Sequence, residues 1–309
     1  MPGTAHYELA PLADGVWAGL ARPTGAAVSN AGLIDLGPQT LVFDTGMAPR
    51  AGAAMRQAAV DRTGRPPGLV ANSHHHLDHL LGNQAFPERT AIYATRRTIE
   101  VLAERQEEIG RILRPEALDR EIAELAMRVR EATDSRTRSR WSLELGFDRI
   151  VRPEAAEIRL TIPTVGFEDR LALPGDLGAE LRTFGSGHTA GDAVLFLPGS
   201  RTLFAGDLVL NRVHPSLGDG DPEHWIEVLR RLEALRPERI VPGHGPVAGP
   251  EAIDAMVAYL EAILPLAGTT GRPAIPAACE GWKWPGQFDA NVEFLRGRAA
   301  ARSRQRTGA

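Results

Sequence analysis

Short apolar runs separated by glycine, proline and asparagine mark the first part of the chain, and this pattern predicts β-strands. The runs are residues 16–18, 27–34 and 40–44. Residues 47–62 then have the spacing of a helix, which the glycine–proline cluster at 64–68 ends. A short apolar run at 69–72 predicts a buried strand. Strands and helices in this order indicate a layered α/β fold.

The next segment has a different pattern, in which apolar residues recur every three or four positions and charged residues fill the other faces. These apolar residues are Ile99, Leu102, Ile109, Leu113, Leu118, Ile122, Leu125 and Val129. The spacing predicts two amphipathic helices, interrupted near Pro115, within a helical insertion at about 95–150. A lid, a dimer face that would make a homodimer, and packing against the rest of the domain are all compatible with it.

Strand patterns return after this insertion and alternate with further helices. Strands are predicted at 158–165, 170–173, 179–184, 193–197, 202–205 and 239–241, and helices at 222–235, about 250–264 and 287–303. The order fits two sheets with helices outside them. We therefore expect a single domain over residues 1–309, with the insertion at about 95–150 and C-terminal helices at about 250–303.

Composition narrows the classes of function. The net charge of −4 leaves no basic footprint for nucleic acid. No apolar stretch is long enough to span a membrane, and the start of the chain does not have the pattern of a signal peptide, so a cytoplasmic protein is expected. The only cysteine, Cys279, excludes an internal disulfide and a cysteine-based zinc site. We expect a small-molecule substrate and no partner of nucleic acid or membrane.

The strongest chemical signal is a run of histidines directly after the predicted strand at 69–72. It reads His74-His75-His76-Leu77-Asp78-His79. In an extended segment, residues two apart point the same way, so His74 and His76 can face one metal ion. Asp78 and His79 come at the turn and can face a neighbouring position. Imidazole and carboxylate ligands suit zinc, and also iron or manganese.

Three further fragments each place a ligand type in a glycine-flanked turn after a predicted strand. They are the turns at 185–192 with His188, 204–207 with Asp207 and 241–245 with His244. Glycine lets the backbone turn sharply and leaves room near a metal. A single such residue would usually be an ordinary polar loop residue, but four fragments together predict a shared metal site.

The pattern H-x-H-x-D-H, followed by a histidine, an aspartate and a histidine that each come after a strand, resembles the metallo-β-lactamase superfamily over about residues 15–260. The resemblance implies an αββα sandwich with the site along one edge. It also implies that His74, His76 and His188 hold one metal, that Asp78, His79 and His244 hold a second, and that Asp207 bridges both. Asp44 would orient a ligand histidine. His75 would point away and hydrogen-bond to its surroundings.

The aspartate at the bridging position makes the chain resemble the glyoxalase-II-like branch, because the β-lactamases of the superfamily lack it. The C-terminal region, however, has no obvious Arg/Lys cluster to bind the carboxylates of glutathione. The resemblance implies a metallo-hydrolase with two Zn²⁺ (or Fe or Mn), whose metal-bound hydroxide cleaves a thioester, lactone or ester and in which Asp78 orients the attacking water. An iron-dependent oxidoreductase like the sulfur dioxygenases is the alternative. A β-lactamase and a non-catalytic binding protein are less favoured.

The substrate-binding residues are the least defined part of the prediction. Trp282 and Trp284 lie in a glycine–proline-flanked segment, and either pack the last helix or form an aromatic wall of the pocket. His214 follows the Asp207 turn and lies either at the surface or at the mouth of the site. These three residues are therefore the candidates for substrate contact.

Overall fold

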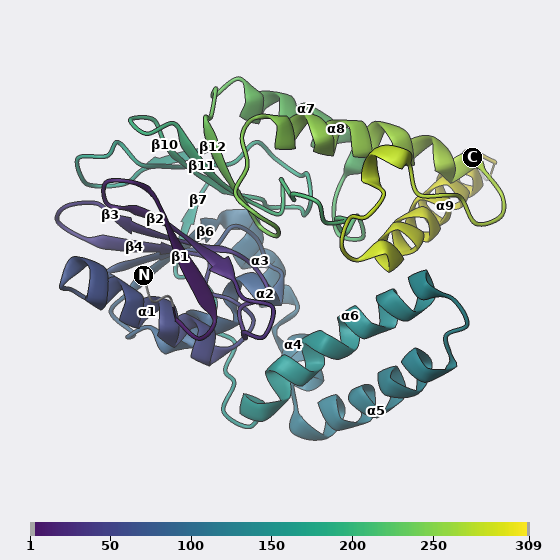
Figure 1. Ribbon diagram of the computed structural model, residues 1–309, viewed down its shortest axis with the longest axis horizontal. Helices are drawn as coiled ribbons and strands as arrows, with labels where there is room; N and C mark the ends of the chain where they lie inside the picture. The colour runs from purple at the N-terminus through teal and green to yellow at the C-terminus, as the bar shows by residue number, and fades with distance from the viewer. Residues whose placement is uncertain (1–3, 308–309) are drawn as a thin grey trace.

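Two β-sheets face each other, with helices on their outer faces, and a pair of long helices extends to one side (Figure 1). The structure is a computed structural model that describes residues 4–307. The layers run helix, sheet, sheet, helix, which confirms the αββα sandwich expected from the sequence.

The first sheet has seven strands in the spatial order β1-β2-β3-β4-β5-β6-β7. Its strands are β1 (Tyr7–Ala13), β2 (Val16–Ala21), β3 (Ala31–Asp35), β4 (Thr40–Phe43), β5 (Leu69–Ala71), β6 (Ala91–Thr95) and β7 (Val165–Phe167). Strands β1 to β4 pair antiparallel, and β4 to β7 pair parallel. The carboxyl ends of β4 and β5 therefore meet at one edge of the sheet, where α/β proteins commonly build their sites.

The second sheet has five strands in the order β12-β11-β10-β9-β8. Its strands are β8 (Arg170–Ala172), β9 (Glu180–Arg182), β10 (Val194–Leu197), β11 (Thr202–Gly206) and β12 (Arg239–Pro242). Strands β11 and β12 pair parallel, so their carboxyl ends also lie at one edge.

The described chain also contains helices between and after these strands. They are α1 (Pro49–Thr63), α2 (Leu77–Leu80), α3 (Arg96–Glu104), α4 (Gln106–Ile112), α5 (Pro115–Glu131), α6 (Ser135–Val151), α7 (Pro222–Glu233), α8 (Glu251–Ile263) and α9 (Pro285–Thr307), with short 3-10 helices η1 (Leu81–Ala85), η2 (Arg152–Glu154), η3 (Leu264–Gly268) and η4 (Ala277–Cys279). Helix α1 covers the first sheet, and α7 and α8 cover the second (Figure 1). No helix in the described range has the length and apolar character needed to cross a membrane.

Alternating side chains in the strands explain why the sheets stack. Ile34 and Leu41 point into the core between the sheets, whereas Leu33 and Val42 point to the opposite face and pack with α1. Because successive residues of a strand face opposite sides, strands that are apolar at every position are covered on both faces. The continuous apolar runs of the sequence reflect this double burial.

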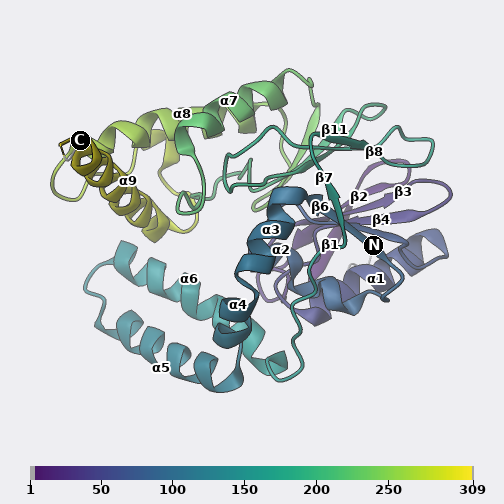
Figure 2. The same cartoon turned by 180° about the vertical axis from the view of Figure 1, so that it is seen from behind.

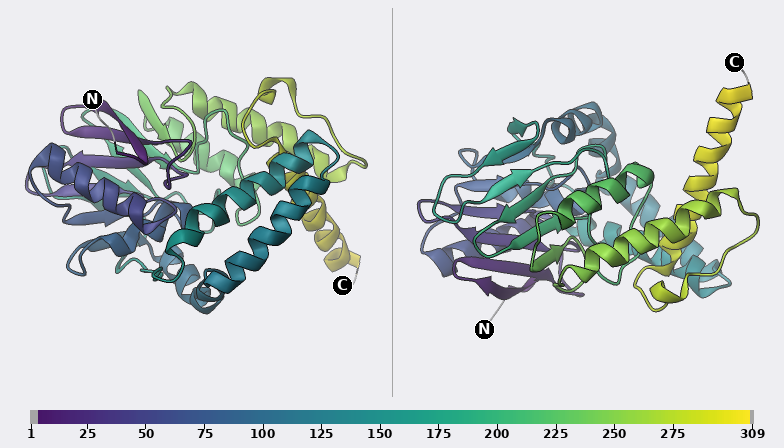
Figure 3. Two further views of the ribbon diagram at one scale, coloured as in Figure 1. Left: turned by 60° about the horizontal axis from the view of Figure 1, so that its bottom comes forward. Right: turned by 90° about the horizontal axis from the view of Figure 1, so that it is seen from above.

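The helical insertion contains four helices, α3 to α6, whereas the sequence predicted two. Thr95 caps α3 by accepting a hydrogen bond from the Thr98 amide, and Asp134 caps α6 in the same way. These caps, together with Pro115, divide the amphipathic pattern into shorter pieces. Figure 2 shows α3 and α4 leading from the sheets to the α5–α6 pair, and Figure 3 shows α5 and α6 side by side.

The strand predicted at 158–165 is wrong for most of its length, because only Val165 lies in a strand. Ile158, Leu160 and Ile162 do alternate in the sequence, but they pack against the apolar cluster of the helical insertion. Alternating apolar residues show that one side of an extended segment is buried, and they do not show that it pairs. Strands β1 and β6 were not predicted.

Candidate metal centre

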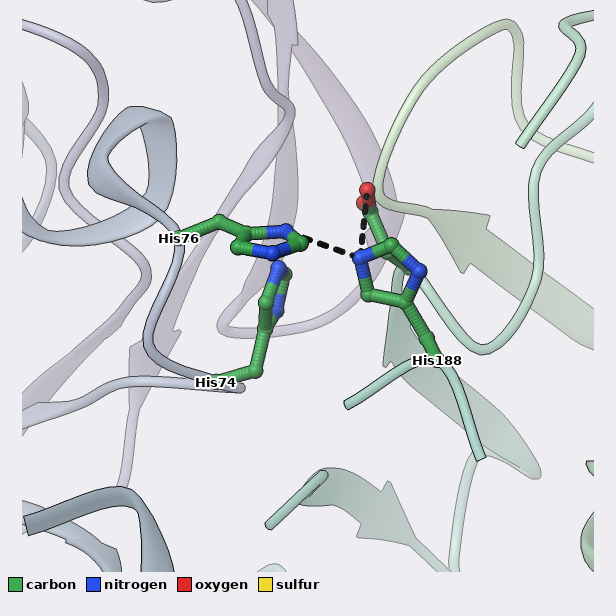
Figure 4. Close-up of side chains that lie close together, drawn as sticks. His74, His76 and His188 are labelled. Carbon is green, nitrogen blue, oxygen red and sulfur yellow. Dashed lines mark hydrogen bonds and ion pairs between the residues drawn. The ribbon is translucent and has the colours of Figure 1, made fainter. Parts of the chain in front are cut away.

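The histidines and aspartates of the sequence motifs lie together at the carboxyl ends of the strands. One group contains His74, His76, His188 and Asp207, and a second contains Asp78, His79 and His244. Within each group, one nitrogen or oxygen atom of every residue lies within 4.8 Å of those of the others. Figure 4 shows His74, His76 and His188 pointing toward one another from two separate loops.

Asp207 joins the two groups. Its Oδ1 lies 3.1 Å from His79 Nε2. Its Oδ2 lies 3.5 Å from His188 Nε2 and 3.4 Å from His244 Nε2. A single carboxylate therefore faces ring nitrogens of both groups, which is the arrangement required of a bridging ligand.

The side chains around His74 and His79 determine which of their nitrogens carries the proton. Ser73 Oγ donates to Asp44 Oδ2 at 2.8 Å, so its oxygen is left to accept from His74 Nδ1 at 2.9 Å. Asp44 Oδ2 also accepts from His79 Nδ1 at 2.8 Å. Both rings thus carry the proton on Nδ1 and turn the lone pair of Nε2 inward.

Each of the other three imidazoles also donates a hydrogen bond from the ring nitrogen that faces away from the group. His188 Nδ1 donates to the carbonyl of Ser216 at 3.0 Å, and His244 Nδ1 donates to the carbonyl of Val28 at 3.2 Å. His76 is reversed, because its Nε2 donates to Asp219 Oδ2 at 2.9 Å and its Nδ1 faces inward. Each of the five rings therefore donates from its outer nitrogen and turns the other nitrogen toward the same space.

These inward atoms fit a metal centre better than they fit one another. His74 Nε2, His79 Nε2 and Asp207 Oδ1 are buried and make no hydrogen bond. His76 Nδ1 and His188 Nε2 lie 2.9 Å apart, although hydrogen bonds to Asp219 and Ser216 leave both with lone pairs. Buried polar atoms without partners are costly, and a cation between them removes that cost. Nitrogen and carboxylate donors in these numbers suit zinc.

The two groups differ in their electrostatics. Burial lowers the pKa of His188 to about 3. For His244, burial lowers the pKa, but Asp207 and then Asp78 outweigh it and raise the pKa to about 9. The first group is therefore rich in neutral imidazole, whereas the second has two carboxylates that stabilise positive charge.

The backbone conformation at the site lets these side chains approach one another closely. Gly243 packs so tightly that a Cβ there would lie 1.8 Å from Asp207 Oδ1. Asp44 has a φ of +60°, a left-handed conformation that turns its carboxylate back toward the 73–79 segment. The loop of His188 is held by Asp192, which accepts from the Gly187 and Thr189 amides at 3.0 Å each.

Sequence reasoning missed several residues that support the site. Ser73, Asp192 and Asp219 each hold a histidine of the two groups, or its loop, by hydrogen bonds. The only signal for Asp219 was its place between two glycines after the Asp207 strand. His75 is buried, and its ring packs against the ring of His76. Its Nδ1 has no hydrogen-bond partner among the described residues. The expectation that it hydrogen-bonds is therefore not met.

A small chamber of about 90 Å³ opens directly on the metal groups. Asp78, His214 and Trp284 line it, together with Leu143 and Phe147 of α6. Trp284 lies against His244, with ring centroids 4.8 Å apart. Its structural position thus matches the aromatic-wall interpretation of the sequence.

Of the other two candidates, Trp282 lies away from the chamber and His214 lines it. Trp282 stacks on Tyr259, with centroids 5.6 Å apart and an interplanar angle of 14°, and does not line the chamber. It packs the C-terminal core, as the alternative interpretation expected. His214 is buried between Trp282, Tyr259 and Phe288, and both of its ring nitrogens lack hydrogen-bond partners.

Fold and site together define an αββα protein with a histidine- and aspartate-rich metal centre at the sheet edge. The family model of the metallo-β-lactamase superfamily matches residues 24–244. The chain belongs to this superfamily.

Curated relatives match parts of the chain. A metallo-β-lactamase type 2 from Bacteroides fragilis is 34% identical over 107 residues, covering 32% of this chain and 43% of the relative. A hydroxyacylglutathione hydrolase from Mesorhizobium japonicum is 27% identical over 178 residues, covering 58% of this chain and 48% of the relative. Another from Rhodobacter capsulatus is 38% identical over 82 residues, covering 25% and 32%. The chain thus spans less than half the length of each, and the two hydrolases support the glyoxalase-II-like branch.

Solved structures show the same fold. A metallo-β-lactamase from Pontibacter korlensis superposes with a TM-score of 0.59 at 18% identity, covering 83% of this chain and 99% of the other. One from Hirschia baltica gives a TM-score of 0.58 at 17% identity, covering 82% and 97%. At these identities the likeness concerns the fold alone.

Proposed function

We propose that this protein is a metal-dependent hydrolase that uses two divalent cations, zinc in our proposal, to cleave an activated acyl bond in a small molecule. The observation that carries the proposal is the shared orientation of the five imidazoles. Each uses its outer nitrogen in a hydrogen bond and turns the other toward the carboxylates of Asp78 and Asp207. In a structural core, each of these five inward ring nitrogens would need a hydrogen-bond partner of its own.

Each of the two groups of side chains would bind one of the two cations. His74, His76 and His188 would hold the first cation, Asp78, His79 and His244 the second, and Asp207 both. When bound, two such cations polarise an acyl carbonyl and lower the pKa of water toward about 7, so that a nucleophile is available at neutral pH.

The chain's own side chains then orient the reactants. Asp78 and Asp207 both line the chamber, and the side chain of Asp78 is the more exposed of the two, at 14% against 9%. Asp78 would accept a hydrogen bond from the attacking water and hold it toward the acyl carbon. Leu143, Phe147 and Trp284 give the chamber an apolar wall on one side.

A thioester, a lactone or another activated ester is the proposed substrate class. Asp207 at the bridging position and the partial matches to hydroxyacylglutathione hydrolases support it. The match to a metallo-β-lactamase makes a β-lactam a necessary member of any substrate panel.

The test is hydrolysis of that panel by zinc-loaded protein and by protein stripped with a chelator. We expect turnover of a thioester, lactone or ester that disappears on chelation and returns with zinc. Persistent turnover in the stripped protein would contradict the proposal. A protein that holds about one iron per chain and hydrolyses nothing would instead be assigned to iron-dependent oxidation.

A further inference from the structure

A second, larger cavity of about 630 Å³ adjoins the catalytic chamber. Leu143, Phe147, His244 and Trp284 line both spaces, so the two adjoin at these side chains. The volume lies within the range of about 300–1,000 Å³ that is typical of small-molecule sites. The chamber itself has room only for the reacting group, so the rest of a substrate must lie in the larger cavity.

The walls of this cavity are mostly apolar. Helix α6 contributes Leu143, Phe147 and Ile150 on one side, and Leu20, Val28 and Val213 come from the sandwich. Burial of a hydrocarbon chain against such walls is favourable in proportion to the apolar area removed from water. The walls therefore fit an extended apolar group.

The charges on the cavity are all of one sign. Arg22 and Lys283 line it, and no aspartate or glutamate does. Arg22 Nε is fixed by the carbonyls of Thr4 and Tyr7, at 3.1 and 3.3 Å. Within residues 4–307, neither cation forms an ion pair with a carboxylate, although many other arginines do. Two unpaired cations over an apolar cavity fit a ligand that carries a negative charge.

We propose that this cavity binds the acyl part of the substrate, and that this part is an apolar chain carrying a carboxylate. The inference rests on the proposed function and names the substrate class of the same site. The ester or thioester carbonyl lies in the chamber at His244 and Asp78, the chain lies along α6, and the carboxylate is held by Lys283 and Arg22.

Gly146 provides a substitution that fills the cavity without strain. It lies on α6 in the cavity wall, and a Cβ built there meets nothing within 4 Å. Gly146→Leu should therefore fold and narrow the cavity. Gly110 on α4 is the matched control, since it is also a helical glycine with open space around its Cβ and does not line the cavity.

The first experiment compares thioesters that share a small neutral thiol, N-acetylcysteamine, and differ in the acyl group: acetyl, decanoyl and the monothioester of decanedioic acid. For the zinc-loaded protein we expect kcat/KM to rise in that order. Gly146→Leu should lower kcat/KM for both ten-carbon substrates by about tenfold or more relative to kcat/KM for the acetyl thioester in the same variant. Gly110→Leu should match the wild type. Equal losses for all three thioesters in Gly146→Leu, or none, would overturn the proposal.

Lys283→Gln tests the charge. It should abolish the advantage of the decanedioyl over the decanoyl thioester, because the cation acts only on the carboxylate and both substrates are compared in the same variant. Added salt should weaken the same advantage in the wild type. An unchanged preference in Lys283→Gln would exclude this residue as the carboxylate partner and overturn that part of the assignment.

Direct binding separates failure of this inference from failure of the proposed function. Calorimetric titration of the zinc-loaded protein with decanedioate needs no turnover, and acetate measures the contribution of a carboxylate at the metals alone. We expect decanedioate to bind more tightly than acetate, and the gain to fall about tenfold in Gly146→Leu but not in Gly110→Leu. Binding of this kind in a protein that hydrolyses nothing would support the cavity assignment and contradict the proposed hydrolase function. Equal binding of the two acids would end the cavity assignment alone.

Discussion

The metal centre and the helical wall beside it are built in different ways. At the centre, seven side chains from loops and from the short helix α2 converge on one buried space, and a hydrogen bond fixes each imidazole. The wall is one face of α6, where Leu143, Phe147 and Ile150 contribute shape and little polar chemistry. The centre therefore depends on the identity of single atoms, whereas the wall depends on where a whole helix is placed.

This difference implies different sensitivities to mutation. A change at the centre removes a ligand or misorients one, and should act on metal content and on kcat. A change at the wall should act on substrate affinity and on the stability of the helix pair, and should leave the metal in place. The following predictions test this separation, beginning with the largest expected effect.

Removal of a ligand should have the largest effect. His76→Ala should lower kcat/KM on the order of a thousandfold or more, because the nitrogen that faces His188 is lost from the first group. Circular dichroism should show an intact fold, since His76 lies in a loop and 23% of its side chain is exposed. His6→Ala, a histidine outside both groups, is the control. Full activity of His76→Ala would contradict the assignment of the centre.

Removal of a residue that only orients a ligand should have a smaller effect. Asp219→Ala leaves His76 in place but removes the acceptor of its Nε2 proton. Loss of such a partner typically costs about ten- to a hundredfold in metal affinity. A zinc titration with a competing chelator measures it, with the exposed Asp176→Ala as control. Unchanged zinc affinity would show that Asp219 does not position His76.

Detachment of the wall should change affinity without changing metal content. Arg136 on α6 forms an ion pair with Asp289 on α9 and donates to the carbonyl of Pro273 at 2.9 Å. Arg136→Ala should raise KM severalfold and lower the free energy of unfolding by about 1–2 kcal/mol, since the pair is mostly buried. Arg149→Ala, an exposed arginine of the same helix, should do neither. Zinc lost from Arg136→Ala would show that wall and centre are coupled.

A small pH effect should be confined to the helix pair. Burial, with Glu121 and Glu144 nearby, raises the pKa of Asp148 to about 6. A carboxyl with a raised folded pKa stabilises the fold while it is protonated, below the unfolded value of about 4, and this contribution is lost as the pH rises through 6. Asp148→Asn should therefore gain about 1 kcal/mol over the wild type at pH 8 and little at pH 4, after allowance for solvent screening.

Urea unfolding of the two proteins at both pH values measures this difference. The exposed Asp14→Asn is the control and should show no pH-dependent gain. An equal gain for Asp148→Asn at pH 4 and pH 8 would mean that titration of this carboxyl is not its source.

Much of the fold could be predicted because strands buried on both faces have long apolar runs. The prediction failed where an apolar segment is buried but does not pair with a neighbouring strand. Ile158, Leu160 and Ile162 alternate as in a strand, yet they are buried by helices. The number of helices in the insertion depends on caps such as Thr95 and Asp134, which are common residues and give little signal by themselves.

That the seven side chains lie together could be predicted, because histidine and aspartate in glycine-flanked turns are unusual. The groups that hold these side chains in place could not be predicted. The carbonyls of Val28 and Ser216 hold His244 and His188, and a backbone carbonyl has no residue identity. The cavity depends on which face of α6 meets Trp284, a matter of helix placement that periodicity does not determine.

The central claim is that seven side chains hold two cations, and metal content tests it most directly. After equilibration with zinc and removal of the excess, elemental analysis should give about two zinc ions per chain for the wild type. It should give about one for His244→Ala, which removes a ligand of the second group only. A wild type that retains no metal, or a His244→Ala protein that retains as much as the wild type, would contradict the account.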